Sequence, residues 1–336
     1  MKSKVTLAQI AAATGVSVNA VSRALNDKSD ISDATKEKIK NAAREMGYIA
    51  NSSARSLRSG KTNTIGVIMD MFNQYYSKIA SEVEQCVGAF GYSVIMFNSN
   101  NSAEKEYKAV VTAMESGVDG IIICPVGVET EGVKLILKYK IPLVLMEQYS
   151  AQPEVGCVVR DDTRGGYIAA EHLIELGHTK ILTIFGNEQT YSSLQKLDGM
   201  RGAMRMYGVQ ENVKRIDTVN NKPEKLIPQI EKLIENEVFT AVICGDDVLA
   251  LNVSYVLLRT GKRIPKDVSI VGFGDFQQNI VCYPMLTTIT VPVNKLSVEA
   301  AEILIAKINN EEIEDKRILP VELKVRRSTS YGPNMR

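Results

Sequence analysis

Residues 6–26 read TLAQIAAATGVSVNAVSRALN, and this stretch decides the organisation of the N-terminal part of the chain. Thr6 followed by Gln9 is a capping-box pair, and apolar residues then recur at helical spacing, which predicts a helix. Gly15 comes where that helix should end, because a left-handed C-cap suits glycine best. Ser17 is a good N-cap for a second helix. The sequence therefore predicts two short helices joined by a glycine turn.

The second helix has two faces of different character. Ala20, Val21, Ala24 and Leu25 form an apolar face, and Val18, Asn19, Ser22 and Arg23 form the opposite face. Arginine can make two hydrogen bonds to guanine, and asparagine can do so to adenine. A third helix follows, capped by Ser32 and ended by Gly47. The pattern is typical of a DNA-recognition helix, while a small helical subdomain without a DNA role is the alternative.

Charge is unevenly distributed along the chain. Residues 1–61 hold 11 lysines and arginines and five acids, a net of +6, whereas the other 29 cations and 34 acids give −5. The overall charge of +1 thus hides a basic head on an acidic body. Such asymmetry indicates a polyanionic partner for the head and binding that weakens with salt.

The stretch NSSARSLRSG, residues 51–60, is a candidate short helix between Asn51 and Gly60. Its one large apolar residue, Leu57, lies between Arg55 and Arg58. Apolar side chains that enter a base step from the minor groove sit among basic residues in this way. A plain polar linker is the alternative.

The segments TLAQIAAATGVSVNAVSRALN, ISDATKEKIKNAAREMGYIAN and SSARSLRSGKTNTIGVI resemble the lac repressor-type (LacI/GalR) family of transcription regulators. The resemblance extends to VRRST at residues 325–329 and so covers nearly the whole chain. It implies a helix-turn-helix headpiece at 1–48, a hinge helix or linker at 49–61, and an effector-binding and dimerisation core at 62–336.

The resemblance also implies roles for DNA-binding residues. The residues expected to read bases in the major groove are Val18, Asn19 and Arg23. Those expected to hold the DNA backbone are Leu7, Ser17, Ser22, Asn26, Ser32, Thr35 and Asn51. Leu57 would open the central step of a palindromic site, and the hinge residues Ala54, Arg55 and Arg58 complete the set.

From residue 64 the pattern changes to short apolar runs separated by amphipathic helical stretches. The runs are 64–69, 93–98, 120–126, 142–146, 157–160, 180–185, 215–219, 239–244, 268–273 and 286–291. Apolar strands that alternate with helices indicate parallel sheets covered on both faces. Two sets of about five strands predict an α/β core of two doubly wound parallel-sheet subdomains, and the resemblance implies the same periplasmic-binding-protein-like fold.

The family fold has two halves joined by three crossings. We expect crossings near 160–162, 291–293 and 323–325. The subdomain next to DNA would then comprise about 62–160 and 294–323, and the far subdomain about 161–291 and 324–336.

Polar residues cluster at the ends of the predicted strands, where doubly wound sheets bind ligands. The candidate effector-binding residues are Asp70, Asn73, Tyr75, Tyr76, Arg160, Asp161, Tyr191, Lys196, Asp246, Asp275 and Phe276. Carboxylates beside aromatic rings suit a polyhydroxylated ligand, because acids accept hydroxyl hydrogen bonds and rings cover apolar faces. The alternative for each aspartate is that it caps a helix or forms an ion pair across the hinge.

Several positions depart from the family pattern. Lys196 replaces an arginine that usually clamps the effector, and lysine cannot form the planar fork. Gly274 replaces the usual pocket aspartate, although Asp275 follows. Asp162 and Asp246 stand where asparagine is common. These changes alter the charge of the pocket, so we transfer no particular sugar from the family.

Other classes of protein find little support. Residues 1–30 lack the apolar segment of a signal peptide, and no apolar run approaches the ~18 residues needed to span a bilayer. The five cysteines are scattered, and the two histidines, His172 and His178, lack metal-ligand spacing. A residue set for catalysis is missing too. We therefore expect a cytoplasmic, nucleoid-associated protein with no membrane partner, catalysis, metal or cofactor.

The sequence thus predicts a dimeric repressor that binds palindromic double-stranded DNA and responds to a small-molecule effector, a sugar or sugar derivative. The ligand could induce or co-repress, and a phosphoprotein could replace it, as in one branch of the family. A solute-binding module without a DNA role and an enzyme built on the α/β body are the rival classes.

Overall fold

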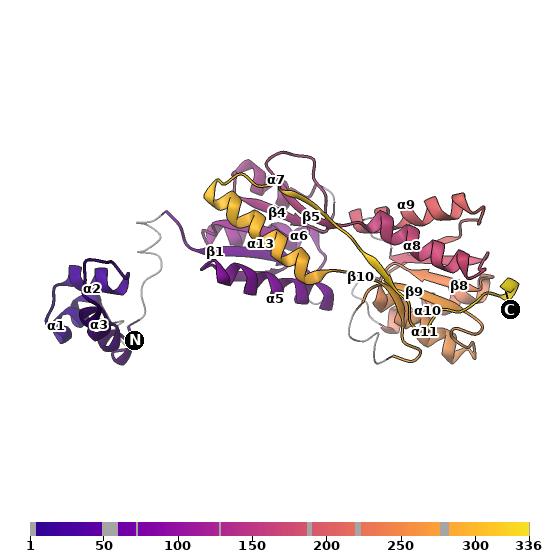
Figure 1. The fold of residues 1–336 in the computed structure, drawn as a ribbon, viewed down its shortest axis with the longest axis horizontal. Coiled ribbons are helices and arrows are strands. Elements are labelled where there is room, and N and C mark those ends of the chain that lie inside the picture. The colour runs from indigo at the N-terminus through magenta and orange to yellow at the C-terminus, as the bar shows by residue number, and fades with distance from the viewer. Residues whose placement is uncertain are drawn as a thin grey trace. The chain divides into compact units, whose positions relative to one another are not determined.

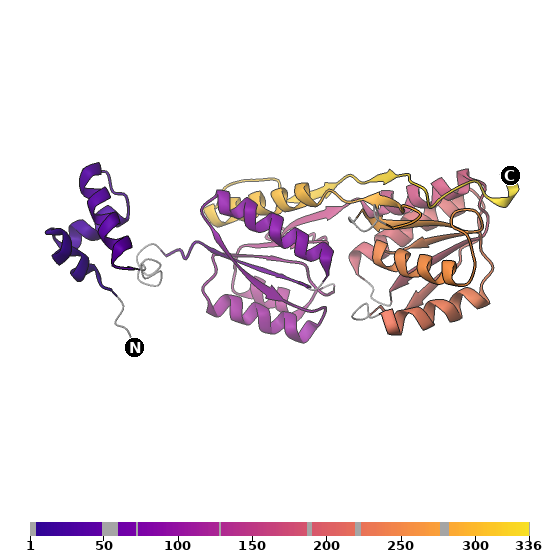
Figure 2. The same cartoon turned by 90° about the horizontal axis from the view of Figure 1, so that it is seen from below.

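The computed structural model describes residues 5–48, 60–71, 73–127, 129–186, 190–218, 223–275 and 282–335. The chain divides into two compact units, Met1–Thr62 and Asn63–Arg336. The smaller unit is helical, and the larger contains two sheets with helices on both sides of each (Figure 1, Figure 2). Most of the predicted hinge segment, residues 49–59, lies outside the described residues.

The smaller unit contains three short helices, α1 (Leu7–Thr14), α2 (Val18–Leu25) and α3 (Asp33–Glu45). The predicted caps are confirmed, because Thr6 and Gln9 form a capping box and Gly15 ends α1 at a φ of 71°. Ser17 and Ser32 accept hydrogen bonds from backbone N–H groups in the first turns of α2 and α3. The buried core of this headpiece consists of Ile10, Ala11, Val21, Ala24, Ile39 and Ala43.

The first half of the larger unit is a parallel six-stranded sheet with the order β11-β5-β4-β3-β1-β2. Its strands are β1 (Thr64–Met69), β2 (Ser93–Asn98), β3 (Gly120–Ile123), β4 (Leu143–Met146), β5 (Gly156–Arg160) and β11 (Lys316–Leu319). Helices α5 (Gln74–Ala89) and α13 (Val293–Asn309) pack together on one face, and α6 (Ala103–Glu115) and α7 (Glu131–Lys138) on the other (Figure 2).

The second half has the sheet order β12-β10-β9-β8-β6-β7, in which β12 is antiparallel to β10 and the other pairs are parallel. Its strands are β6 (Ile181–Gly186), β7 (Val213–Ile216), β8 (Ala241–Cys244), β9 (Ser269–Gly274), β10 (Thr287–Thr290) and β12 (Glu322–Lys324). Helices α8 (Asp162–Glu175) and α9 (Tyr191–Met206) cover one face, and α10 (Pro223–Asn236) and α11 (Asp247–Arg259) the other. A 3₁₀ turn, η2 (Pro333–Met335), follows near the C-terminus.

This arrangement confirms the predicted fold and explains its sequence pattern. Strands β3, β4, β5, β8 and β9 are buried along their whole length, because helices cover both faces of each sheet. The edge strand β2 is mostly exposed or half-buried. Strand β7 begins and ends earlier than the expected 215–219, at Val213–Ile216.

The chain passes between the halves three times. The first two passages, after β5 and after β10, lie where the sequence pattern placed them. The third lies between β11 and β12, at residues 320–321, and not at 323–325 as expected, because β12 already pairs with β10 of the second half. Figure 1 shows this C-terminal segment, in yellow, running from one half to the other.

Candidate functional site

Helix α2 presents the predicted base-reading residues on its outer face. Val18 is 47% exposed, and Asn19 and Arg23 are exposed as well. On the inner side, Val21 and Ala24 are fully buried in the headpiece core. The sequence therefore builds a helix whose apolar side is anchored and whose polar side is presented outward, as major-groove reading requires.

The residues expected to hold the DNA backbone lie around this helix. Ser17, Asn26 and Ser32 are exposed, whereas Leu7, Ser22 and Thr35 are half-buried. The Asn26 amide donates a 2.6 Å hydrogen bond to the Ser22 carbonyl, so part of its bonding capacity is used internally. Five hinge positions lie outside the described residues, namely Asn51, Ala54, Arg55, Leu57 and Arg58. Contacts with phosphate stay a prediction for all of these residues.

Arg23 has a partner that the sequence did not reveal. One terminal nitrogen of its guanidinium lies 2.6 Å from a carboxylate oxygen of Asp30, in the segment between α2 and α3. Hydrogen bonding within this pair raises the pKa of Arg23 and lowers the pKa of Asp30. Both side chains are about half exposed, at 45% and 48%. The pair therefore sits on the surface that α2 presents.

A second cluster lies where the two halves of the larger unit meet, centred on Arg160 at the end of β5. The guanidinium of Arg160 is 2.5 Å from the carboxylate of Glu147 and 3.2 Å from that of Asp162. It also donates hydrogen bonds to the hydroxyls of Ser192, at 2.8 Å, and Tyr75, at 3.3 Å. Tyr75 and Glu147 belong to the first half, and Asp162 and Ser192 to the second. Arg160 therefore joins the halves through its side chain.

The electrostatics of this cluster keep the arginine charged. Burial lowers the pKa of Arg160, but the carboxylates of Asp162 and Glu147 outweigh that effect and raise the pKa well above its usual value. Burial raises the pKa of Glu147, although Arg160 opposes the shift. The Nε atom of Arg160 is buried without a hydrogen-bond partner among the described residues. A buried donor is thus left over in an otherwise paired cluster.

Lys196, on α9, extends the cluster with a second buried cation. It is 6% exposed, its Nζ donates a 3.0 Å hydrogen bond to the Gly245 carbonyl, and it lies 4.7 Å from the ring centroid of Phe273. Burial lowers its pKa, while the nearby carboxylate of Asp162 acts in the opposite direction. A lysine ammonium has three donors, so Lys196 can bind an acceptor in addition to Gly245.

Several predicted ligand residues have structural partners instead. Asp161, Asp246 and Asn73 are the N-caps of α8, α11 and α5. Asp275 forms ion pairs with Arg326 and with Lys324, the latter at 3.4 Å. For these positions the structure thus shows capping and ion pairing, the alternatives considered from sequence, and an effector role stays a prediction.

Aromatic residues also meet near the boundary of the halves. Tyr191 stacks on Tyr149 with ring centroids 6.3 Å apart and an interplanar angle of 22°. Tyr76 lies beside Tyr75 at 5.2 Å. Asp70 is half-buried after β1, and Phe276 lies outside the described residues. The Tyr149–Tyr191 stack adds a second contact between the halves.

Sequence reasoning missed Glu147, Tyr149 and Ser192. Glu147 directly follows β4, so the strand-end rule that selected Arg160 applied to it equally. Ser192 adjoins Tyr191, which was predicted. The contact between Arg160 and Ser192 joins different halves, and local patterns carry no information on it.

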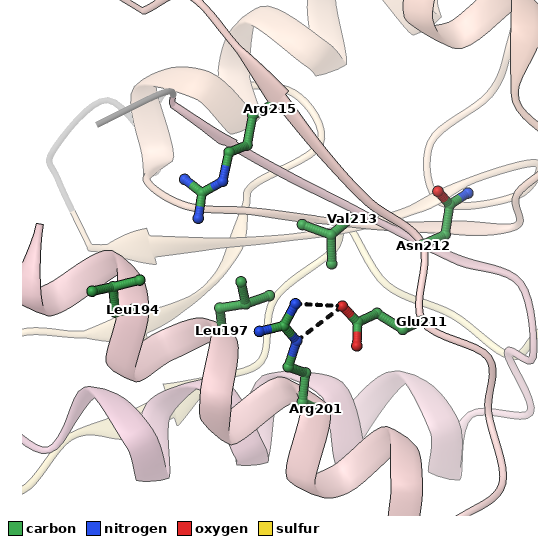
Figure 3. Close-up of a pocket in the computed structure, with 7 residues that line it drawn as sticks. All are labelled: Leu194, Leu197, Arg201, Glu211, Asn212, Val213 and Arg215. Carbon is green, nitrogen blue, oxygen red and sulfur yellow. Dashed lines mark hydrogen bonds and ion pairs between the residues drawn. The ribbon is translucent and has the colours of Figure 1, made fainter. Parts of the chain in front are cut away.

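A separate pocket opens on the second half. It has a volume of about 750 Å³ and is lined by Leu194, Leu197, Arg201, Glu211, Asn212, Val213 and Arg215. Figure 3 shows Arg201 turned toward Glu211, and its Nε and a terminal nitrogen bind one carboxylate oxygen at 2.9 and 2.7 Å. None of the predicted effector residues lines this pocket, so it is distinct from the Arg160 cluster.

Among the described residues, no group of three or more His, Cys, Asp or Glu side chains is arranged to hold a metal ion. Nor does any helix in the described ranges have the length and apolar character needed to cross a membrane. The five cysteines are free thiols, and three of them, Cys124, Cys157 and Cys244, are buried.

Comparison with known proteins agrees with both parts of the fold. The model for bacterial regulatory proteins of the lacI family matches residues 6–51, and the model for a periplasmic binding protein-like domain matches residues 170–329. HTH-type transcriptional regulator DegA of Bacillus subtilis (strain 168) is 32% identical over 333 residues, covering 97% of this chain and 98% of DegA.

Solved structures agree as well. A crystal structure of the lac repressor dimer bound to operator and the anti-inducer ONPF has a TM-score of 0.86 and 26% identity, covering 98% of this chain and all of that one. A LacI family transcriptional regulator from Enterococcus faecium with bound ribose has a TM-score of 0.72 and 27% identity, covering 80% of this chain and 99% of that one.

The headpiece and the two-sheet body define a DNA-binding transcription regulator with an effector-binding domain. The chain belongs to the LacI family of bacterial regulatory proteins, whose members are transcription regulators and not enzymes. The rival classes of enzyme and of solute-binding module without a DNA role are therefore set aside.

Proposed function

We propose that this chain is a repressor that binds a palindromic operator as a homodimer, under the control of an effector held between the two halves. The observation that carries the proposal is the outward face of α2, where Val18, Asn19 and Arg23 are exposed above a buried apolar side. A dimer would present two such helices to two half-sites. Because its partner would be chromosomal DNA, we place the protein in the cytoplasm, at the nucleoid.

Replacement of Arg23 by alanine tests base reading. Sites selected from random DNA by the full-length protein are compared with sites selected by the Arg23→Ala variant. We expect the preference at one position of each half-site to relax, with a loss of about 1–3 kcal/mol at the preferred base. The reason is that an arginine fork discriminates guanine through paired acceptors.

The matched control is Arg44→Ala, which removes one positive charge from the exposed end of α3 in the same unit. It should leave the selected sequence unchanged. If Arg23→Ala weakens binding equally on all sequences and lowers the salt dependence, Arg23 contacts phosphate and the base-reading role is refuted.

The homodimer is tested by light scattering of the purified protein. A dimer of the 37.0 kDa chain has a mass of about 74 kDa, twice that of the chain. A monomer at the concentrations that bind operator would contradict the proposed symmetry.

We further propose that the effector is a carbohydrate or a close derivative, bound at the Arg160 cluster. Support comes from the buried donors of Arg160 and Lys196, from the Tyr149–Tyr191 rings beside them, and from the ribose bound by the Enterococcus faecium relative. Hydroxyl groups would accept from the cations and donate to Glu147 or Asp162.

A thermal-shift screen against sugars, sugar phosphates, nucleosides and amino acids tests this class. A ligand at 100 times its dissociation constant stabilises the folded state by about 2.7 kcal/mol. We expect a sugar to raise the melting temperature of the native protein and not that of Lys196→Met. A shift only with nucleosides or amino acids would overturn the carbohydrate assignment.

One observation favours a second candidate, a co-repressor- or phosphoprotein-dependent regulator. Gly274 lacks the carboxylate expected in the pocket, and the adjacent Asp275 is engaged by Arg326 and Lys324. The proposed effector site thus lacks one hydrogen-bond acceptor that a sugar would use. If no small molecule shifts the melting temperature, dependence on a phosphoprotein becomes the better candidate, whereas a ligand that raises the melting temperature and tightens operator binding is a co-repressor.

A further inference from the structure

Asp27 and Asp30 lie between α2 and α3, Asp33 is the first residue of α3, and each of the three pairs with a cation of the headpiece. Asp27 binds Lys40 at 2.5 Å, and Asp33 binds Lys36 at 3.4 Å. Asp30 differs from these two, because its partner is Arg23 of the recognition helix, at 2.6 Å. This pair therefore places a carboxylate against the arginine that we propose to read a base.

The backbone around Asp30 is held in place, so the carboxylate is not on a loose loop. The segment folds back onto Arg23, whose carbonyl accepts hydrogen bonds from the backbone N–H groups of Asn26 and Lys28. The next residue, Ile31, packs against the headpiece core. Asp30 is thus fixed on both sides, and its pairing with Arg23 constrains the long arginine side chain.

The geometry leaves Arg23 able to read a base. A guanidinium carries five N–H donors in a fixed fork, and the ion pair to Asp30 engages one terminal nitrogen. That nitrogen carries a second N–H, which forms with an N–H of a neighbouring nitrogen the parallel fork that guanine accepts. Holding the side chain before DNA arrives reduces the rotamer freedom that is lost on binding.

The charge of Asp30 has a second effect. A carboxylate beside the DNA-facing surface repels phosphates, and it competes with them for the guanidinium of Arg23. When the base opposite Arg23 is wrong, an unrestrained arginine could turn to a phosphate and recover much of the binding energy. Asp30 prevents this alternative contact with phosphate, because it holds the Arg23 side chain and neutralises its charge.

We propose that Asp30 is a positioning residue that fixes Arg23 toward the base edges and withholds it from the phosphates, so that Asp30 increases sequence discrimination. The inference rests on the proposed base-reading role of Arg23. It predicts that removal of the Asp30 charge strengthens nonspecific binding while it weakens discrimination, a combination that loss of a merely structural residue would not produce.

The experiment uses the full-length protein and three duplexes. These are the site selected by the native protein, the same site with the Arg23-dependent base pair changed, and an unrelated sequence. Affinities are measured at two salt concentrations for the native protein, Asp30→Asn, Asp30→Ala, Asp33→Asn and Arg23→Ala. Far-UV circular dichroism confirms that each variant is helical.

For Asp30→Asn and Asp30→Ala we expect tighter binding to the unrelated sequence than the native protein shows. The ratio of the affinity for the selected site to the affinity for the changed site should be about threefold to tenfold smaller than in the native protein. The salt slope on the changed site should steepen by about 0.9, the value for one extra phosphate contact. Asp33→Asn, the matched control, makes the same charge change and should leave the ratio unaltered.

The outcomes separate the two proposals. If Arg23→Ala leaves the ratio unchanged, base reading by Arg23 fails. If Arg23→Ala lowers the ratio and the Asp30 variants do not, the positioning role of Asp30 is overturned while base reading stands. Equal changes in Asp30→Asn and Asp33→Asn would also overturn it, since general charge would then account for both.

Discussion

One buried side chain, Arg160, makes polar contacts with both halves of the effector domain. Its charge is buried at 8% exposure, and its neutralisation comes from Glu147 on one side and Asp162 on the other. Removing one partner from a buried ion cluster is far more harmful than removing a surface pair, because the remaining charges lose compensation in a poorly solvated site.

Arg160→Met should therefore destabilise the protein strongly. We expect a loss of about 3–5 kcal/mol in the free energy of unfolding, measured by urea denaturation. The control is Arg317→Met, because Arg317 also pairs with two acids, Glu299 and Glu314, but near the surface. Surface pairs contribute about 0–1 kcal/mol. Equal losses of unfolding free energy in the two variants would show that the ion pairs of Arg160 contribute no more to stability than those of Arg317 near the surface.

Among the secondary-structure elements, α8 and α9 are joined by a backbone contact that two glycines allow. A Cβ atom on Gly199 would lie 1.9 Å from the Thr163 carbonyl oxygen, and one on Gly166 would lie 2.0 Å from the Lys196 carbonyl oxygen. Real Cβ atoms do not come this close to backbone atoms. The close approach also carries Lys196 and Ser192 of α9 to the end of β5, where Arg160 lies.

Gly199→Ala should push the two helices apart. Overpacking of this kind usually reduces stability by about 1–3 kcal/mol, and here a backbone atom must move. Gly202→Ala lies three residues further along α9, where a Cβ would meet only the Tyr167 ring, at an ordinary 3.7 Å. It should be neutral or stabilising by up to about 1 kcal/mol, because alanine favours helices. Thermal unfolding of both variants checks this contrast, and a stable Gly199→Ala variant would contradict the close contact.

The sequence predicted elements better than contacts. Strands β1 and β2 match the predicted runs residue for residue, and α1 and α2 begin at the predicted caps. Strands β11 and β12 were not predicted, because they are short and mostly half-buried or exposed. The sequence predicted only some of the residues that contact Arg160. A polar residue after a strand can line a binding site or cap the next helix, as Asp161 and Asp246 do, and the sequence pattern does not distinguish these two roles.

Across the whole molecule, the C-terminal segment ties distant parts of the second half together. After its last passage between the halves the chain forms β12 and then docks along the sheet. The Ser328 hydroxyl donates to the Ile270 carbonyl at 2.6 Å and accepts from the Thr287 backbone N–H at 2.7 Å. His172 of α8 meets the next residue, Thr329, at 3.0 Å. Helix, sheet and C-terminal segment are thus coupled at one point.

This coupling should make stability depend on pH through His172. Burial lowers its pKa below the usual 6.5, and the charge of His178 lowers it further. In the unfolded chain the imidazole takes up its proton near pH 6.5, whereas in the folded protein it does so at lower pH. Between these two values the unfolded state binds more protons, so the His172 contribution is complete above pH 6.5 and is lost as the pH falls.

His172→Gln keeps a hydrogen-bonding group near Thr329 and removes the titration. The free energy of unfolding from urea denaturation at pH 7.5 and 5.5 should fall more for the native protein than for this variant. The acids and the one other histidine, His178, are present in both proteins, so only the difference between the two falls reports His172. An equal fall would mean that His172 has the same pKa in the folded and unfolded chain, and the docking of the C-terminal segment would then not depend on its neutral form.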